Sequence, residues 1–295
     1  MTPTQPDPVA TAGAIGRVLA DETVLEAARA LAEAERTQVP MRQLSLQYPD
    51  MTVEDAYAIQ RALIEQKLAE GRRLVGRKIG LTSRAMQQSV SIDEPDFGAL
   101  LDDMIFEDGA EIPHGRFIRP RIEMELAFIL SEAVTGPGCS ALDVLRAAEF
   151  VVPALEILDA RVQMTDPDTG HGRTIVDTIA DNAADAGVVL GGRPAKPLEI
   201  DIRWVAALLY RNGVIEESGV AAAVLHHPAN SAAWLANKLA GYGVGLEPGQ
   251  IILSGSFIRP VHAYGGDVFH ADYGPLGTIT CRFAAAPTSA PPDDR

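Results

Sequence analysis

The chain has 295 residues, of which 47% are hydrophobic, so it can bury one large core or two modest ones. Its formal net charge of −15 argues against a nucleic-acid surface, which needs clustered basic residues. Two cysteines are too few for a disulfide framework or a zinc site. We expect a cytoplasmic protein without membrane partners, because a secretory signal and an apolar run of roughly 18–20 residues are both absent.

The amino-terminal part of the chain is predicted to be helical. Residues 1–14 are rich in Pro, Ala and Thr and are expected to form a disordered tail, followed by a helical region over 15–72. One helix is predicted over 22–37 and a second over 53–71. Thr52 and Asp55 have the spacing of a capping box at the start of the second helix.

Residues 73–283 are predicted to form a catalytic domain of mixed structure, with a second disordered tail over 284–295. Short β-like runs are separated by Gly, Pro and Asp. The predicted strands are 74–79, 122–130, 151–158, 187–190, 202–210, 250–253 and 277–283. Residues 227–239 are predicted to be helical, and residues 211–213 fit a tight turn. Since strands and helices do not alternate regularly, an α+β fold on a coiled or rolled sheet is favoured over a doubly wound sheet.

Three glutamates carry most of the chemical information in the sequence. Residues 122–130 alternate, so Glu123 and Glu125 share one strand face with roughly 6.5–7 Å between their backbone positions. Glu156 lies in an apolar run, where an unpaired carboxylate is costly to bury. One interpretation is a solvated strand face, with Glu156 paired to an arginine. The other is a carboxylate cage for Mg²⁺ or Mn²⁺, with Ca²⁺ still open and zinc disfavoured by the lack of nearby His or Cys.

Two further residues have polar side chains that suit proton transfer or anion binding. Lys78 lies in a predicted strand and by itself fits an ordinary surface lysine. Beside a cation it could hold an anionic substrate or act as an acid or base. Asp96 lies between Pro95 and Gly98, which favours a turn, although an aspartate on a loop over a metal site could equally carry a proton.

Five segments resemble the hydratase/decarboxylase branch of the fumarylacetoacetate hydrolase superfamily. They are residues 76–83 (GRKIGLTS), 94–98 (EPDFG), 120–125 (PRIEME), 153–156 (PALE) and 177–182 (DTIADN). The resemblance extends from about residue 40 to residue 283. It implies a mixed β-roll core with an N-terminal helical cap, assembled as a homo-oligomer.

The resemblance also implies roles for individual residues. The metal ligands fall on Glu123, Glu125 and Glu156, the active-site lysine on Lys78 and the loop aspartate on Asp96. Mg²⁺ is the implied cofactor, with Mn²⁺ as a substitute. Substrate contacts are expected from four further residues, namely Leu81, Thr82, Ser256 and Arg259.

The implied activity is the hydration of an unsaturated 2-oxo dicarboxylate in the catabolism of aromatic compounds. The later segments 210–217, 227–230, 233–239 and 255–257 favour this activity within the branch. Arg259 is the expected partner of the second carboxylate. Hydration of a shorter acid and decarboxylation on the same metal site remain alternatives, and so does a role as a subunit without turnover of its own.

Overall fold

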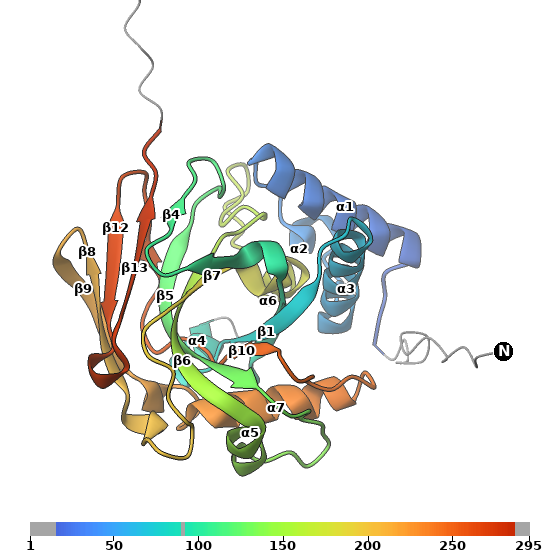
Figure 1. The fold of residues 1–295 in the computed structure, drawn as a ribbon. Coiled ribbons are helices and arrows are strands. Elements are labelled where there is room, and N and C mark those ends of the chain that lie inside the picture. The colour runs from blue at the N-terminus through green and yellow to red at the C-terminus, as the bar shows by residue number, and fades with distance from the viewer. Residues whose placement is uncertain (1–15, 90–91, 287–295) are drawn as a thin grey trace, which may run out of the picture.

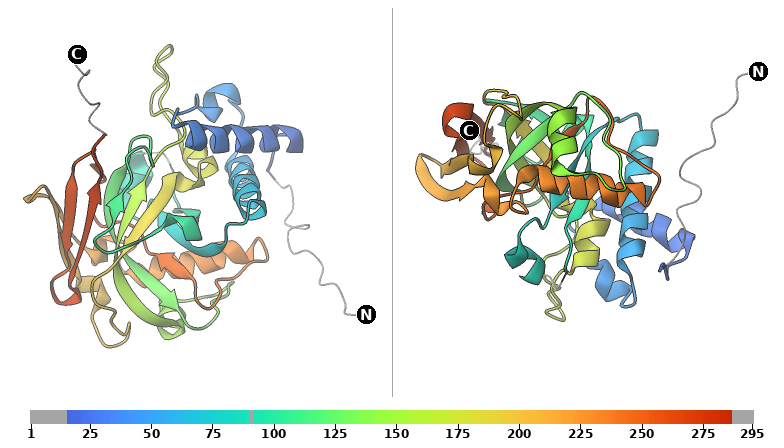
Figure 2. Two further views of the ribbon diagram at one scale, coloured as in Figure 1. Left: turned by 45° about the horizontal axis from the view of Figure 1, so that its top comes forward. Right: turned by 90° about the horizontal axis from the view of Figure 1, so that it is seen from below.

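The computed structural model describes residues 16–89 and 92–286 and contains two β-sheets with helices packed around them (Figure 1). The predicted tail over 1–14 and most of the tail over 284–295 lie outside the described residues. The N-terminal helices and the smaller sheet lie on opposite sides of the larger sheet (Figure 2). Within the described residues, no helix has the length and apolar character needed to cross a membrane.

Three helices precede the first strand, whereas the sequence predicts two, over 22–37 and 53–71; the additional one is the short α2. The helices are α1 (Asp21–Thr37), α2 (Leu44–Gln47), α3 (Val53–Ala69), α4 (Arg84–Ser89), α5 (Ala141–Ala147), α6 (Ile175–Ala180) and α7 (Pro228–Ala240). α3 packs against both α1 and α6. The predicted capping box is confirmed: the Asp55 amide donates to Thr52 Oγ1 at 3.2 Å, and the Thr52 amide donates to Asp55 Oδ2 at 3.0 Å. This reciprocal pair satisfies backbone donors at the start of α3.

The larger sheet is mixed and curves around the centre of the molecule (Figure 1). Its order is β2-β1-β10-β5-β6-β7-β3, and β11 pairs with β5. The strands are β1 (Leu74–Gly80), β2 (Asp96–Leu101), β3 (Ile105–Glu107), β5 (Arg121–Leu130), β6 (Ala148–Leu158), β7 (Asp185–Leu190), β10 (Ile251–Leu253) and β11 (Val261–His262). β1 runs parallel to β10 and β3 parallel to β7, while the other pairs are antiparallel. The predicted α+β class is confirmed.

The smaller sheet has the order β4-β13-β12-β8-β9. Its strands are β4 (Glu111–Ile112), β8 (Ala206–Arg211), β9 (Val214–Val220), β12 (Val268–Asp272) and β13 (Thr278–Phe283). Asn212 and Gly213 both have positive φ, at 55° and 82°, which confirms the predicted tight turn between β8 and β9. The predicted strand over 202–210 is wrong at its start. Residues Ile202–Trp204 form a 3₁₀ helix, in which the Trp204 amide donates to the Asp201 carbonyl.

Gly76 provides a test of the central pairing between β1 and β10. A Cβ at this position would lie 2.0 Å from the Ile251 carbonyl oxygen, so no larger residue fits without moving a strand. We expect Gly76→Ala to lower the free energy of unfolding by at least about 1–3 kcal/mol, measured by urea denaturation. Gly172→Ala is the control, because a Cβ at that position meets nothing within 4 Å. Equal stability of the two variants would contradict this account.

Candidate metal centre and active site

Three carboxylates converge on the inner part of the larger sheet. Glu123 and Glu125 lie on β5, and Glu156 lies on β6 directly opposite Glu123. One oxygen from each residue lies within 4.8 Å of the others, and each residue is at most 5% exposed. The interpretation of a solvated strand face is therefore wrong. The charged partner of Glu156 is also a lysine rather than an arginine.

The buried carboxylates have more acceptor oxygens than protein donors. Glu125 Oε2 accepts a hydrogen bond from the Gly255 amide at 2.7 Å, whereas Glu123 Oε1, Glu125 Oε1 and Glu156 Oε2 have no hydrogen-bond partner. Burial and the adjacent Glu156 raise the pKa of Glu123 to about 8 and that of Glu125 well above its usual range. Such unpartnered carboxylate oxygens suit a hard divalent cation, which would offset the cost of burying the charges. The residues therefore fit Mg²⁺ or a similar ion.

Lys78 and Asp96 lie beside this group of carboxylates. Lys78 Nζ is 3.2 Å from Glu156 Oε1, and both residues are buried. Burial alone would lower the pKa of Lys78, but Glu156 and Asp96 outweigh burial and raise it above its usual range. Burial raises the pKa of Asp96, and the positive charge of Lys78 opposes this shift. The pair can thus hold a fixed positive charge next to a carboxyl group that can take up a proton.

The prediction that Asp96 lies in a turn or loop is wrong, because Asp96 is the first residue of β2. It pairs with Gly80 on β1, and this tertiary pairing overrides the turn signals of the flanking Pro95 and Gly98. A Cβ at residue 80 would lie 2.1 Å from Asp96 Oδ1 and 3.2 Å from Lys78 Nζ. Glycine at position 80 therefore leaves the space that the Asp96 carboxylate occupies.

Two loops border the carboxylates next to Glu125. Thr82 is buried and follows Leu81, which adopts a left-handed conformation with φ of 55°. A Cβ on Gly255 would lie 2.4 Å from the Thr82 side chain, so the two loops touch at a position where only glycine fits. The Ser256 hydroxyl accepts a hydrogen bond from the Ile258 amide at 3.2 Å. Substrate binding by Leu81, Thr82 and Ser256 stays a prediction, but the structure places all three residues on these loops.

Arg259 lies apart from the other predicted site residues. Its side chain is 87% exposed, and its guanidinium pairs with Glu217 at 2.7 Å. Substrate binding by this residue also stays a prediction.

Sequence analysis missed two residues near the site. The first is Gly255, whose amide donates a hydrogen bond to the Glu125 carboxylate. The second is Asp185, which is buried and has two carboxylate oxygens without a hydrogen-bond partner. Burial and the nearby Glu156 raise the pKa of Asp185. No local pattern identifies either residue, because each contact depends on strand pairing.

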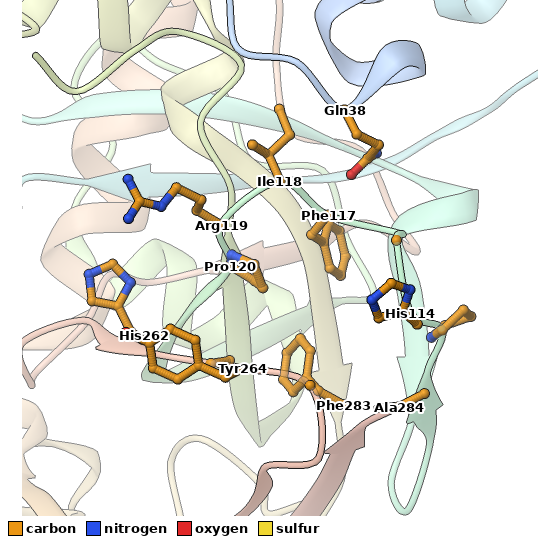
Figure 3. Close-up of a pocket in the computed structure, with 14 residues that line it drawn as sticks. Gln38, His114, Phe117, Ile118, Arg119, Pro120, His262, Tyr264, Phe283 and Ala284 are labelled. Atoms are coloured by element: carbon orange, nitrogen blue, oxygen red, sulfur yellow. The ribbon is translucent and has the colours of Figure 1, made fainter. Parts of the chain in front are cut away.

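A cavity of about 450 Å³ lies outside this site (Figure 3). It is lined by the segment before β5, by β11 and by the following loop, and it includes Arg119, His262 and Tyr264. None of the five residues predicted to bind metal or act in catalysis lines it. The unpartnered carboxylates, rather than this opening, therefore mark the chemical site.

Comparison with known proteins identifies the family. The chain is 61% identical over 256 residues to a 2-oxo-hept-4-ene-1,7-dioate hydratase from Escherichia coli, covering 87% of this chain and 96% of that protein. It belongs to the hydratase/decarboxylase branch of the fumarylacetoacetate hydrolase superfamily. A second member of the branch, a 2-keto-4-pentenoate hydratase from Paraburkholderia xenovorans, is 40% identical over 88% of this chain and 94% of that protein. No protein-family model matches the chain.

Solved structures confirm the fold of this branch. A 4-oxalocrotonate decarboxylase from Pseudomonas putida G7, complexed with magnesium and adipate, superposes with a TM-score of 0.86 at 33% identity. The match covers 90% of this chain and 99% of that structure. A yeast fumarylacetoacetate hydrolase family protein shares the fold with a TM-score of 0.53 at 17% identity, covering 73% of this chain and 94% of that structure.

The stability of the metal-free protein should depend on pH in a defined direction. Glu123 has a folded pKa of about 8 against an ordinary value of 4.5. Between these values the unfolded chain has lost a proton that the folded chain retains, so the free energy of unfolding falls as pH rises. We expect this fall in EDTA and its reversal by Mg²⁺, measured by thermal unfolding across that range. Stability in EDTA that is constant or rises with pH would contradict the electrostatics of the site.

Proposed function

We propose that the chain is a Mg²⁺-dependent hydratase that converts 2-oxohept-4-ene-1,7-dioate into 4-hydroxy-2-oxoheptane-1,7-dioate in the catabolism of aromatic compounds. The observation that carries the proposal is the 61% identity to the Escherichia coli hydratase over 96% of its length. The buried group of Glu123, Glu125 and Glu156 next to Lys78 and Asp96 supports it. Cytoplasmic location, assembly as a homo-oligomer and use of Mn²⁺ in place of Mg²⁺ remain predictions.

The three glutamates would hold the ion through carboxylate oxygens. Bound there, Mg²⁺ would supply Lewis-acid polarisation of the 2-oxo acid end of the substrate. Lys78 keeps its proton, because its carboxylate neighbours raise its pKa, and its ammonium group is placed to hold the substrate's negative charge. Thr82 and the loop around Ser256 would confine this end of the substrate.

Asp96 is our candidate for the proton transfers. Its pKa is raised by burial, and its Oδ1 has no hydrogen-bond partner. A carboxyl group of this kind can accept a proton from C3 and return one to C5, which moves the double bond into conjugation with the 2-oxo group. Water then adds its hydroxyl to C4 and a proton to C3, so that the net change is the gain of one water.

Decarboxylation is the competing activity within the branch. A 4-oxalocrotonate decarboxylase from Pseudomonas putida is 34% identical to this chain over its full length. The higher identity to the dioate hydratase favours hydration. Product analysis separates the two activities, because hydration adds one water and decarboxylation releases CO₂.

The first test is a mass-spectrometric product assay with 2-oxohept-4-ene-1,7-dioate. We expect a gain of one water with Mg²⁺-loaded protein and none after treatment with EDTA. Absence of hydration in both samples, together with CO₂ release from 4-oxalocrotonate, would replace the proposal by decarboxylation. Absence of both activities would contradict an independent catalytic role and favour a subunit that depends on a partner.

A second test removes one proposed metal ligand. Glu156→Gln should lower kcat/KM by more than about 100-fold, because loss of an outer-shell partner alone costs roughly 10–100-fold. Glu149→Gln is the matched control, since Glu149 is an exposed glutamate on the same strand, β6. Mg²⁺ affinity, measured by calorimetry, should fall with activity in the first variant only. Similar activity and affinity in both variants would exclude Glu156 as a ligand.

A further inference from the structure

Arg173 is a partly buried cation without an ion-pair partner among the described residues. Its Nη1 is buried with no hydrogen-bond partner, and among the described residues no acid lies within ion-pair distance of its guanidinium. Burial lowers the pKa of Arg173. The negative charge of Asp181, the residue that follows α6, opposes this shift. An unpaired buried N–H group costs free energy, and a ligand that accepts its hydrogen bond would offset that cost.

Arg173 lies two residues before α6, and α6 packs against β2, the strand that begins at Asp96. Burial raises the pKa of Asp96, and both Lys78 and Arg173 act against this shift by their charge. The Arg173 amide donates to the carbonyl of Met164, which lines the same cavity as Arg121. These contacts place Arg173 near both the strand of Asp96 and the cavity that Arg121 borders.

Arg121 extends the same strand face as the metal-binding glutamates. It lies on β5 two residues before Glu123, so its side chain projects to the same side, roughly 6.5–7 Å along the strand. Among the described residues, no ion-pair partner of Arg121 lies within reach. It borders a cavity of about 360 Å³ together with Arg119 and His262, which also line the cavity in Figure 3. The surface around the start of β5 is therefore locally cationic, although the protein as a whole is acidic.

A short hairpin fixes the backbone of Arg173. The Arg173 amide donates to the Met164 carbonyl at 2.9 Å, and Thr165 and Gly172 form an antiparallel bridge. The carboxylate of Asp166 binds the guanidinium of Arg42 and caps the turn at the end of the hairpin. These contacts hold the residue in place without using its side chain.

We propose that Arg173, together with Arg121, binds the carboxylate at the end of the substrate remote from its 2-oxo acid group. The inference rests on the proposed function and names the residues that select its dicarboxylate substrate over a monocarboxylate. A guanidinium offers two parallel N–H donors that match a carboxylate. With the 2-oxo acid end at the three glutamates, the substrate chain extends along β5 toward Arg121. This assignment takes the role that the sequence gave to Arg259, which is paired with Glu217 at the surface.

The test compares two unreactive ligands that differ only in the distal carboxylate, 2-oxoheptanedioate and 2-oxoheptanoate. Calorimetry with Mg²⁺-loaded wild-type protein should show tighter binding of the dioate by roughly 10–100-fold, the range expected for a hydrogen-bonded charge pair. Arg173→Gln should remove this preference and leave the affinity for the monocarboxylate unchanged. Arg146→Gln, at an exposed arginine on α5, is the matched control and should keep the preference.

Turnover supplies a second readout. In Arg173→Gln, KM for the unsaturated dioate should rise by roughly 10–100-fold with kcat little changed, because the distal contact is the same in the ground and transition states. Arg173→Lys keeps the charge but loses the two-donor geometry, so it should recover part of the preference. Arg173→Lys also replaces Arg173→Gln in the test if the Gln variant does not fold. Thermal unfolding of both variants should match that of wild type or improve, since no structural ion pair is lost.

Several outcomes would overturn the inference. They are equal binding of the two ligands by wild type, equal weakening of both ligands in the Arg173 variants, and loss of the preference in Arg259→Gln but not in Arg173→Gln. Failure of the proposed function gives a different result. A dioate preference that depends on Arg173, without any gain of water in the product assay, would uphold the inference and reject hydration.

Discussion

Three carboxylates, those of Glu123, Glu125 and Glu156, are buried within reach of one another, and the ammonium of Lys78 contacts only Glu156 among them. Repulsion between buried carboxylates is strong, because little water is present to screen it. A divalent cation would remove this repulsion and bind the oxygens that have no hydrogen-bond partner. The electrostatic cost of burying the three carboxylates and their capacity to bind a metal therefore have the same cause.

The larger sheet provides the rigidity that such a site needs. All three glutamates lie on paired strands rather than on loops, and Lys78 and Asp96 lie on the adjacent pair β1 and β2. Sites built on regular elements hold their geometry more accurately than sites built on loops. Two loops meet beside Glu125, where the Gly255 amide donates to its carboxylate and a Cβ on Gly255 would clash with the Thr82 side chain.

Short-range patterns predicted the features that depend on short-range geometry. Alternation placed Glu123 and Glu125 on one face, and the Thr52 capping box was predicted from its spacing. Burial of that face and the register that sets Glu156 opposite Glu123 depend on pairing between distant segments, which no single segment encodes. For the same reason Asp96 was assigned to a turn, although it pairs with Gly80. The direction of a long side chain is also set by tertiary packing, so the sequence alone does not show that the Arg259 side chain is exposed and paired with Glu217.

The central claim is that the three glutamates form a site for a divalent cation. The most direct measurement is a calorimetric titration of Mg²⁺ into metal-free protein near neutral pH, repeated in two buffers with different ionisation enthalpies. The account predicts one ion per chain with net release of protons, because the raised pKa values of Glu123 and Glu125 leave protons for the metal to displace. Absence of binding, or binding without any proton release, would contradict it.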